Sequence, residues 1–381
     1  MEETEEKVRN MSEQKKLPSL QALRALAFIG IFTCHAGLTQ LGAWGASVFL
    51  VLSGFLMVYT YYDRELDTSP KGAVRFAAKK IGKLYPLHII MLVAALPFVV
   101  RGLLQTFSLH GLVKAGTQVV LNALLLQSWI PKSDSYFSLN GVTWYLSICV
   151  FLYLMFPYLL KVIQRYRGRV IACVSIVIVF CVQFGIAFLL RNMTVPMSVS
   201  DNLAKWVTYI CPVFRLGDFF IGCNLGYLFL KRKGSLPIVV ASIGEILVLL
   251  ALVVSQKIFN GHYGFFSTEW FILTILYVPT SALLVYLFAA KEGILTGLLT
   301  NPVLIAIGNV SGSAFLIHQI VIRYLWEIRA RVGGTWFNNW VVLVLAAGIT
   351  GLLIWIYQQA EKKFRKPGAK KKEETKQGAA A

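Results

Sequence analysis

The fold is decided by a stretch near the beginning of the chain. Residues 17–38 read LPSLQALRALAFIGIFTCHAGL. An apolar run of this length can cross a hydrocarbon core about 30 Å thick as a single helix. The run also contains Arg24 and His35, two groups that hydrocarbon disfavours. We therefore predict a spanning helix that carries two polar groups at a fixed spacing.

Similar apolar runs recur through all 381 residues. The chain is 57% hydrophobic and only 14% charged, a composition that excludes an ordinary water-soluble domain. The predicted spans are 18–38, 43–62, 84–104, 142–163, 170–190, 205–230, 236–256, 269–290, 308–328 and 337–359. The sequence thus predicts an all-α, polytopic transmembrane bundle of about ten spanning helices that fills residues 17–365.

The basic residues predict how this bundle is oriented. The formal net charge is +19, but the lysines and arginines sit in short loops between apolar runs, a pattern that excludes a nucleic-acid partner. Under the positive-inside rule these loops are cytoplasmic. A crossing at 117–130 would move the basic loop 161–169 outside, so this short segment is predicted to be re-entrant or interfacial.

The same reasoning predicts a multi-pass protein of the plasma or inner membrane with both termini in the cytoplasm. Residues 1–16 form a polar N-terminus. Residues 366–381 form a basic tail with few apolar residues, which we expect to be disordered.

Arg24 and His35 project from one face of their predicted helix. Their separation of 11 positions rotates the helix by about 1,100°, about 20° from three full turns, and spans roughly 16 Å along the axis. Because a charged group in the bilayer costs at least ~2.5–3.5 kcal/mol, a polar cavity or partner is expected. The alternative is that Arg24 snorkels to anionic lipid while His35 is a hydrogen-bonded core residue.

The next apolar run contains Ser53, Gly54 and Phe55 near its middle. The small pair predicts close helix packing. Farther along, Trp144 begins another span, a position typical of the aromatic belt at a membrane interface.

A basic segment precedes the third span. Lys79, Lys80, Lys83 and Tyr85 are predicted to lie at the inner interface. They are either an ordinary topology signal or a cationic cradle for a phosphorylated cytoplasmic ligand.

Two later spans also carry polar groups. Arg215 and Asp218 are spaced i,i+3, which predicts a local ion pair inside the membrane. Ser311 and His318 lie seven positions apart on one helix face, with His318 near the middle of its span. Two intramembrane histidines and a buried arginine are more than packing requires.

An ordered series of motifs resembles the membrane acyltransferase-3 family across residues 18–365. The series is Arg24 with His35, SVFLVLSGFL from 47, KLYP from 83, WYLS from 144 with FLYLMFP from 151, FRLGDFFIG from 214 and SGSAFLIHQ from 311. The resemblance implies a ten-helix enzyme that takes an acyl group, usually acetyl, from acyl-CoA on the cytoplasmic side. It implies O-acylation of a carbohydrate or lipid-linked glycan beyond the membrane.

Carried over by position, the resemblance implies that Arg24 and His35 are the central catalytic pair. Ser53, Gly54 and Phe55 would support them, as would Trp144, Arg215 and His318. The basic segment Lys79, Lys80, Lys83 and Tyr85 would bind the phosphates of the donor. This chain departs from the family at Cys149 or Val150, where many members have a glutamate, so the type of acceptor is left open.

For the chemistry, His35 is the candidate general base or, alternatively, a transient acyl carrier. No metal is predicted, because the cysteines lie within apolar runs and form no CxxC pair. Two other classes remain as alternatives: a transporter or flippase for a glycan or small polar solute, and a membrane sensor domain without catalysis.

Overall fold

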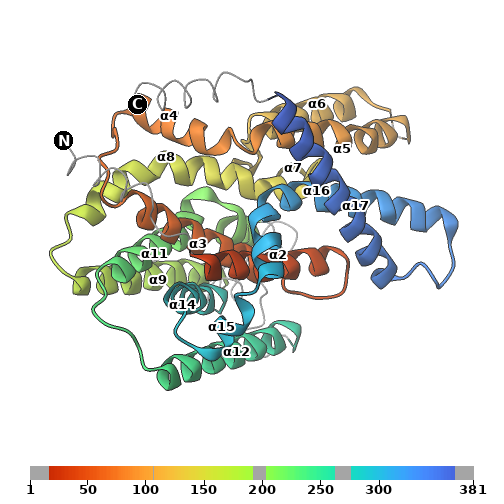
Figure 1. The fold of residues 1–381 in the computed structure, drawn as a ribbon. Coiled ribbons are helices and arrows are strands. Elements are labelled where there is room, and N and C mark those ends of the chain that lie inside the picture. The colour runs from red at the N-terminus through yellow and green to blue at the C-terminus, as the bar shows by residue number, and fades with distance from the viewer. Residues whose placement is uncertain (1–16, 106, 192–202, 262–275, 365–381) are drawn as a thin grey trace, which may run out of the picture.

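The computed structural model describes residues 17–105, 107–191, 203–261 and 276–364, and in these ranges every regular element is a helix (Figure 1). The predicted terminal segments 1–16 and 366–381 lie outside the described residues. In chain order the helices are α2 (Pro18–His35), α3 (Gly42–Tyr61), α4 (Pro70–Ile81), α5 (Tyr85–Gln105), α6 (Leu109–Ala123), η1 (Gln127–Trp129), α7 (Ser133–Tyr136), η2 (Gly141–Thr143), α8 (Trp144–Gln164), α9 (Arg169–Arg191), η3 (Trp206–Ile210), α11 (Pro212–Leu230), α12 (Ile238–Gly261), α14 (Tyr277–Ala290), α15 (Ile294–Leu299), α16 (Pro302–Val332) and α17 (Asn339–Phe364).

The prediction of an all-α polytopic bundle is confirmed. Within the described ranges, 8 helices are long and apolar enough to cross a membrane. They are Gly42–Tyr61, Tyr85–Gln105, Gly141–Gln164, Arg169–Leu190, Leu203–Leu230, Ile238–Ile258, Pro302–Val332 and Asn339–Lys363. The other two predicted spans coincide with α2, which has 18 residues, and with α14, which has 14. Of the predicted span 269–290, residues 269–275 lie outside the described part.

Local signals explain where several helices begin. Proline stands in the first turn of α2, α4, α11 and α16, where its missing N–H costs no hydrogen bond. The Ser69 hydroxyl accepts the Gly72 N–H at 3.0 Å at the start of α4, and the Asn301 side chain accepts the Leu304 N–H at 3.0 Å at the start of α16. These side chains satisfy donors that the first helical turn leaves unpaired.

The C-terminal ends of α3, α8, α11 and α14 meet at one end of the bundle, which we call the basic end. Gln164, the last residue of α8, donates to the backbone carbonyls of Tyr62 and Arg64 at 2.6 and 3.1 Å. Just beyond α11, Arg232 forms an ion pair at 2.6 Å with Glu292, just beyond α14. The basic loops that follow α3, α8 and α11 therefore lie together.

The opposite end holds the C-terminal end of α2 and the beginning of α17. The Asn339 side chain donates to the Gly37 carbonyl at 3.0 Å. Beside it, Arg323 of α16 donates to the Leu139 carbonyl, in the segment just before α8. Helices α2 and α16 therefore run in the same direction, from the basic end toward the opposite end.

Helix α4 packs along α8. Phe76 stacks on Phe156 with ring centroids 5.6 Å apart, while Ile81 at the other end of α4 borders the same cavity as Cys149. Helix α4 thus runs alongside α8 from the basic end toward its middle, because an apolar stripe that includes Ala73, Ala77 and Ile81 is buried there. Lys79 and Lys80 of the basic segment lie in the last turn of this helix.

Helices α5 and α6 form a hairpin. The Tyr85 hydroxyl, at the start of α5, donates to the carbonyl of Ala123 at the end of α6 at 2.9 Å. The helix stops there, and the chain continues to α8 through the short turns η1, α7 and η2. Residues 117–130 are therefore not a spanning helix, as predicted, but α6 begins earlier, at Leu109.

Glycines allow two helix pairs to touch along their backbones. A Cβ atom on Gly54 of α3 would lie 1.9 Å from the Phe219 carbonyl oxygen of α11, and one on Gly222 would lie 1.9 Å from the Val51 oxygen. On α16, a Cβ on Gly308 would lie 1.9 Å from the Gln21 oxygen of α2. Such small residues permit close helix contact inside membranes. The α2–α16 contact positions the site described next.

Candidate active site

The two intramembrane histidines meet between α2 and α16. The His35 Nδ1 and His318 Nε2 atoms lie 2.8 Å apart, and the two rings stack with centroids 5.0 Å apart. On its other side, His318 Nδ1 lies 3.1 Å from the Ala314 carbonyl oxygen, one turn earlier in α16. His318 is completely buried.

These contacts define the tautomer of each neutral ring. A carbonyl can only accept, so His318 carries its proton on Nδ1 and donates to Ala314. His318 Nε2 is then the acceptor, and His35 Nδ1 must donate to it. His35 Nε2 is left with a free lone pair. The arrangement is one in which a second group fixes the tautomer and orientation of a histidine.

His35 borders a cavity of about 170 Å³, which we call the His35 cavity. Trp144 and Tyr209 form an aromatic wall with ring centroids 4.8 Å apart. Gln40 and Phe315 also line it. His35, whose Nε2 is not used by His318, therefore lines a space that can hold a ligand.

Arg24 borders a second cavity of about 120 Å³, which we call the Arg24 cavity. Its buried Nε has no hydrogen-bond partner among the described residues. Lys80 of α4 is a second cation in the wall, and no described residue that lines this cavity is acidic. The helix spacing predicts that Arg24 and His35 line one groove, and this prediction is wrong: each residue lines a cavity, but the two cavities are different.

Polar groups of α3 and α8 complete the Arg24 cavity. Tyr145, Cys149 and Tyr153 of α8 line it together. The Tyr153 hydroxyl in turn lies 3.4 Å from the Ser53 hydroxyl. Cys149 is only 4% exposed and adds a small neutral group to the cavity wall.

The three predicted supporting residues of α3, Ser53, Gly54 and Phe55, have different environments. Ser53 lines the Arg24 cavity. Gly54 lies at the contact with α11 described above. Phe55 is fully buried and packs near Tyr59 and Phe229. Of the three, only Ser53 is in a position to touch a ligand.

The basic segment is also divided. Lys80 lines the Arg24 cavity, and its ammonium lies 4.4 Å from the centroid of the Tyr61 ring. Lys79, Lys83 and Tyr85 are exposed and border neither cavity. Helical rotation separates Lys79 from Lys80, because successive residues point about 100° apart, whereas Lys83 lies in the turn after α4 and Tyr85 begins α5.

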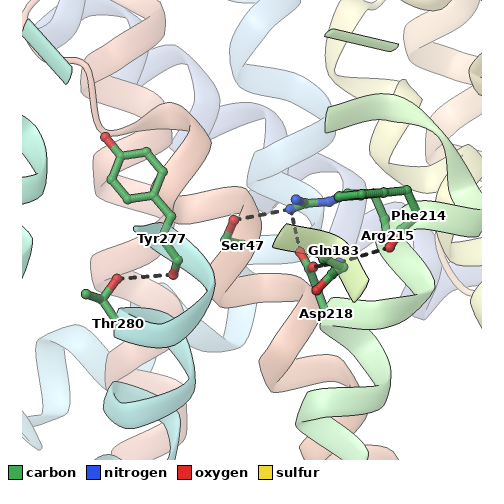
Figure 2. A network of polar contacts seen from close by, with 7 residues as sticks. All are labelled: Ser47, Gln183, Phe214, Arg215, Asp218, Tyr277 and Thr280. Carbon is green, nitrogen blue, oxygen red and sulfur yellow. Dashed lines mark hydrogen bonds and ion pairs between the residues drawn. The ribbon is translucent and has the colours of Figure 1, made fainter. Parts of the chain in front are cut away.

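Figure 2 shows the buried ion pair between Arg215 and Asp218 of α11. Its nitrogen and oxygen atoms are 2.9 Å apart, and both side chains are completely buried. Gln183 of α9 donates to Asp218 at 2.7 Å, and Arg215 donates to the Ser47 hydroxyl of α3 at 3.2 Å (Figure 2). The predicted ion pair therefore forms, and its partners join three helices. A separate contact in the same view joins Thr280 to the Tyr277 carbonyl within α14.

Two aromatic residues of the site were missed from the sequence. Phe315 lines both cavities, and Phe49 lies against it with ring centroids 6.4 Å apart. Phe49 and Phe315 both lie in apolar runs, where an aromatic residue does not stand out from its neighbours in the sequence. In the described part of the chain, no three His, Cys, Asp or Glu side chains gather as metal ligands would.

The fold and the site define a polytopic membrane protein with a pair of hydrogen-bonded histidines at one cavity and two cations, Arg24 and Lys80, at another. Comparison with known proteins gives the family. The acyltransferase domain family matches residues 17–358, so the chain belongs to the membrane acyltransferase-3 family. The prediction of a multi-pass membrane O-acyltransferase is confirmed at this level.

The chain is similar to several curated proteins. It is 28% identical over 334 residues to the acyltransferase MdmB of Streptomyces mycarofaciens, which covers 81% of this chain and 80% of MdmB. It is 25% identical over 343 residues to the O-acetyltransferase OatA of Staphylococcus aureus, covering 84% of this chain and 53% of OatA. The chain thus spans about half the length of OatA. No solved structure gives a significant match.

Proposed function

We propose that this protein transfers an acetyl group from acetyl-CoA at the cytoplasmic face to a hydroxyl of a carbohydrate or cell-envelope glycan outside the membrane. In this proposal the basic end and both termini face the cytoplasm of a plasma or inner membrane. The grouping of basic loops at one end supports the orientation. The similarity to a protein named O-acetyltransferase supports the acyl group and the hydroxyl acceptor.

The observation that carries the proposal is that His35 lines a cavity while its hydrogen bond to His318 leaves the lone pair of Nε2 unused. A hydroxyl in that cavity gives its proton to Nε2 while its oxygen attacks the thioester carbonyl. The carbon–sulfur bond then breaks, and the imidazolium returns the proton to the leaving thiolate. His318 keeps His35 in the basic tautomer and stabilises the imidazolium, as the orienting partner of a catalytic histidine does.

The same lone pair could instead act as a nucleophile, which is the acyl-carrier route named in the sequence analysis. His35 Nε2 can attack the thioester itself and carry the acetyl group before the acceptor takes it. Rapid acid quenching of the enzyme with labelled acetyl-CoA separates the two routes. Label attached to the protein and lost in His35→Ala indicates the carrier, whereas label found only in the product indicates the base.

The donor is placed at the Arg24 cavity. Arg24 and Lys80 are cations with no acidic neighbour in the cavity wall, so an anionic or strongly polar part of acetyl-CoA would satisfy them. The acceptor is placed in the His35 cavity, where Trp144 and Tyr209 offer apolar ring faces and Gln40 a hydrogen-bonding group.

The test uses the protein in lipid nanodiscs with radiolabelled acetyl-CoA and a panel of sugars bearing free hydroxyls. His35→Ala is expected to lower the rate by about 10²–10⁴-fold, the usual contribution of a general acid–base group. His110→Ala is the matched control, because His110 is exposed on α6 and borders neither cavity. His35→Ala that folds normally and keeps more than about a tenth of the rate contradicts the proposal.

A further inference from the structure

The two cavities share one wall. Among the described residues, Phe315 is the one that lines both the His35 cavity and the Arg24 cavity. It belongs to α16, three residues before His318, so both side chains project over neighbouring parts of the same helix face. The Phe315 and His318 rings lie with centroids 5.9 Å apart.

Other aromatic rings hold this phenyl group in place. Tyr145 of α8 packs against it edge to face with centroids 5.6 Å apart, and Phe49 of α3 does so at 6.4 Å. Tyr145 and Phe49 also pack against each other at 6.3 Å. Three helices thus each contribute one ring to a partition, which consists of Phe49, Tyr145 and Phe315.

The partition lies on the route that the proposed reaction requires. The proposed function puts the donor beside Arg24 in one cavity and the reacting histidine in the wall of the other, and Phe315 lines both. An acyl thioester held in the Arg24 cavity that moves to His35 through this shared wall passes the phenyl ring. The space beside the ring limits the size of the acyl group that reaches His35.

We propose that Phe315 determines the acyl-chain specificity of this enzyme and keeps water from the donor. The inference rests on the proposed function. With the ring in place, the passage admits an acetyl group and rejects longer chains. The ring also separates the thioester from water in the His35 cavity, so the donor is not hydrolysed when no acceptor is bound. In that side reaction a water oxygen would attack the carbonyl, and CoA would leave as the thiol.

The experiment compares acetyl-, butyryl- and hexanoyl-CoA in nanodiscs. In Phe315→Ala, the ratio of kcat/KM for hexanoyl-CoA to that for acetyl-CoA should rise by about tenfold or more, because each methylene in an apolar pocket is worth about 10–200-fold in discrimination. Hydrolysis of acetyl-CoA without acceptor should rise in the same variant. Ile317→Ala is the matched control, since Ile317 is a buried neighbour on α16 that borders neither cavity, and its ratio should stay unchanged.

Phe315→Leu serves if the alanine variant does not fold, because leucine retains much of the buried volume, and it should shift the ratio in the same direction. An unchanged ratio in a folded, active Phe315 variant overturns the inference, as does wild-type protein that uses hexanoyl-CoA as well as acetyl-CoA. These outcomes differ from failure of the proposed function. If the proposed function is wrong, the wild-type protein turns over none of the three acyl-CoA donors, or His35→Ala leaves that turnover unchanged.

Discussion

Two arginines in spanning helices of this protein have opposite surroundings. Arg215 is fully buried, forms an ion pair with Asp218 and donates to Ser47 (Figure 2). Arg24 borders a cavity that no described acidic residue lines, and it takes part in none of the ion pairs found in the described part of the chain. Both charges are costly in a bilayer. A paired arginine offsets that cost within the fold, whereas an unpaired one beside a cavity is best explained by a ligand.

The comparison predicts its largest effect on stability at the paired site. Asp218→Leu leaves Arg215 buried without its counter-ion and should destabilise the fold by about 3–5 kcal/mol. Thermal unfolding in detergent measures the change. Adding Arg215→Met to the same chain should restore most of the loss, because an apolar pair of similar volume replaces an ion pair at little cost. If the double variant is as unstable as the single one, the pair has a role that charge compensation does not describe.

A substitution at Arg24, which has no counter-ion, should change enzymatic activity more than stability. Arg24→Lys keeps the charge but loses the planar fork of donors, so we expect kcat/KM to fall by about 10–100-fold with little change in thermal stability. The ratio of rates for the variant and the wild type, measured with the same protein concentration and lipid, gives the answer. A loss of stability equal to that of Asp218→Leu would remove the distinction between the two arginines.

The smallest effect separates two adjacent lysines. Lys80→Gln should raise the KM for acetyl-CoA several-fold with kcat nearly unchanged, since removing a contact made equally in the ground and transition states affects binding alone. Lys79→Gln is the matched control because Lys79 is exposed and borders neither cavity. Equal KM values in both variants would mean that the lysines act through membrane topology and not through the donor.

The sequence was sufficient for much of the fold. Apolar run lengths located the spans, and the 100° rotation per residue put Arg24 and His35 on one helix face, although they line two cavities and not one groove. The spacing of Arg215 and Asp218 predicted their ion pair, since neighbours at i,i+3 share a helix side. These successes all depend on geometry within one helix.

Contacts between helices could not be predicted from the sequence. His318 was recognised as a polar residue that needs a reason, but its hydrogen bond to His35 depends on how closely α2 and α16 approach at Gly308. The position of Phe315 could not be predicted for the same reason, because it depends on helix packing that brings both cavities to its side chain. The basic segment was grouped by composition, whereas its rotation on α4 turns Lys80 inward and leaves Lys79 outside.

The histidine pair also has a consequence for how the protein is made. His35 and His318 are 283 positions apart, so ribosomes that add about 5–20 residues per second synthesise the second histidine roughly 15–60 s after the first. During that interval the newly inserted α2 carries a histidine without its orienting partner. An incomplete chain therefore cannot set the tautomer of His35, and the His35–His318 hydrogen bond forms only after α16 has been synthesised.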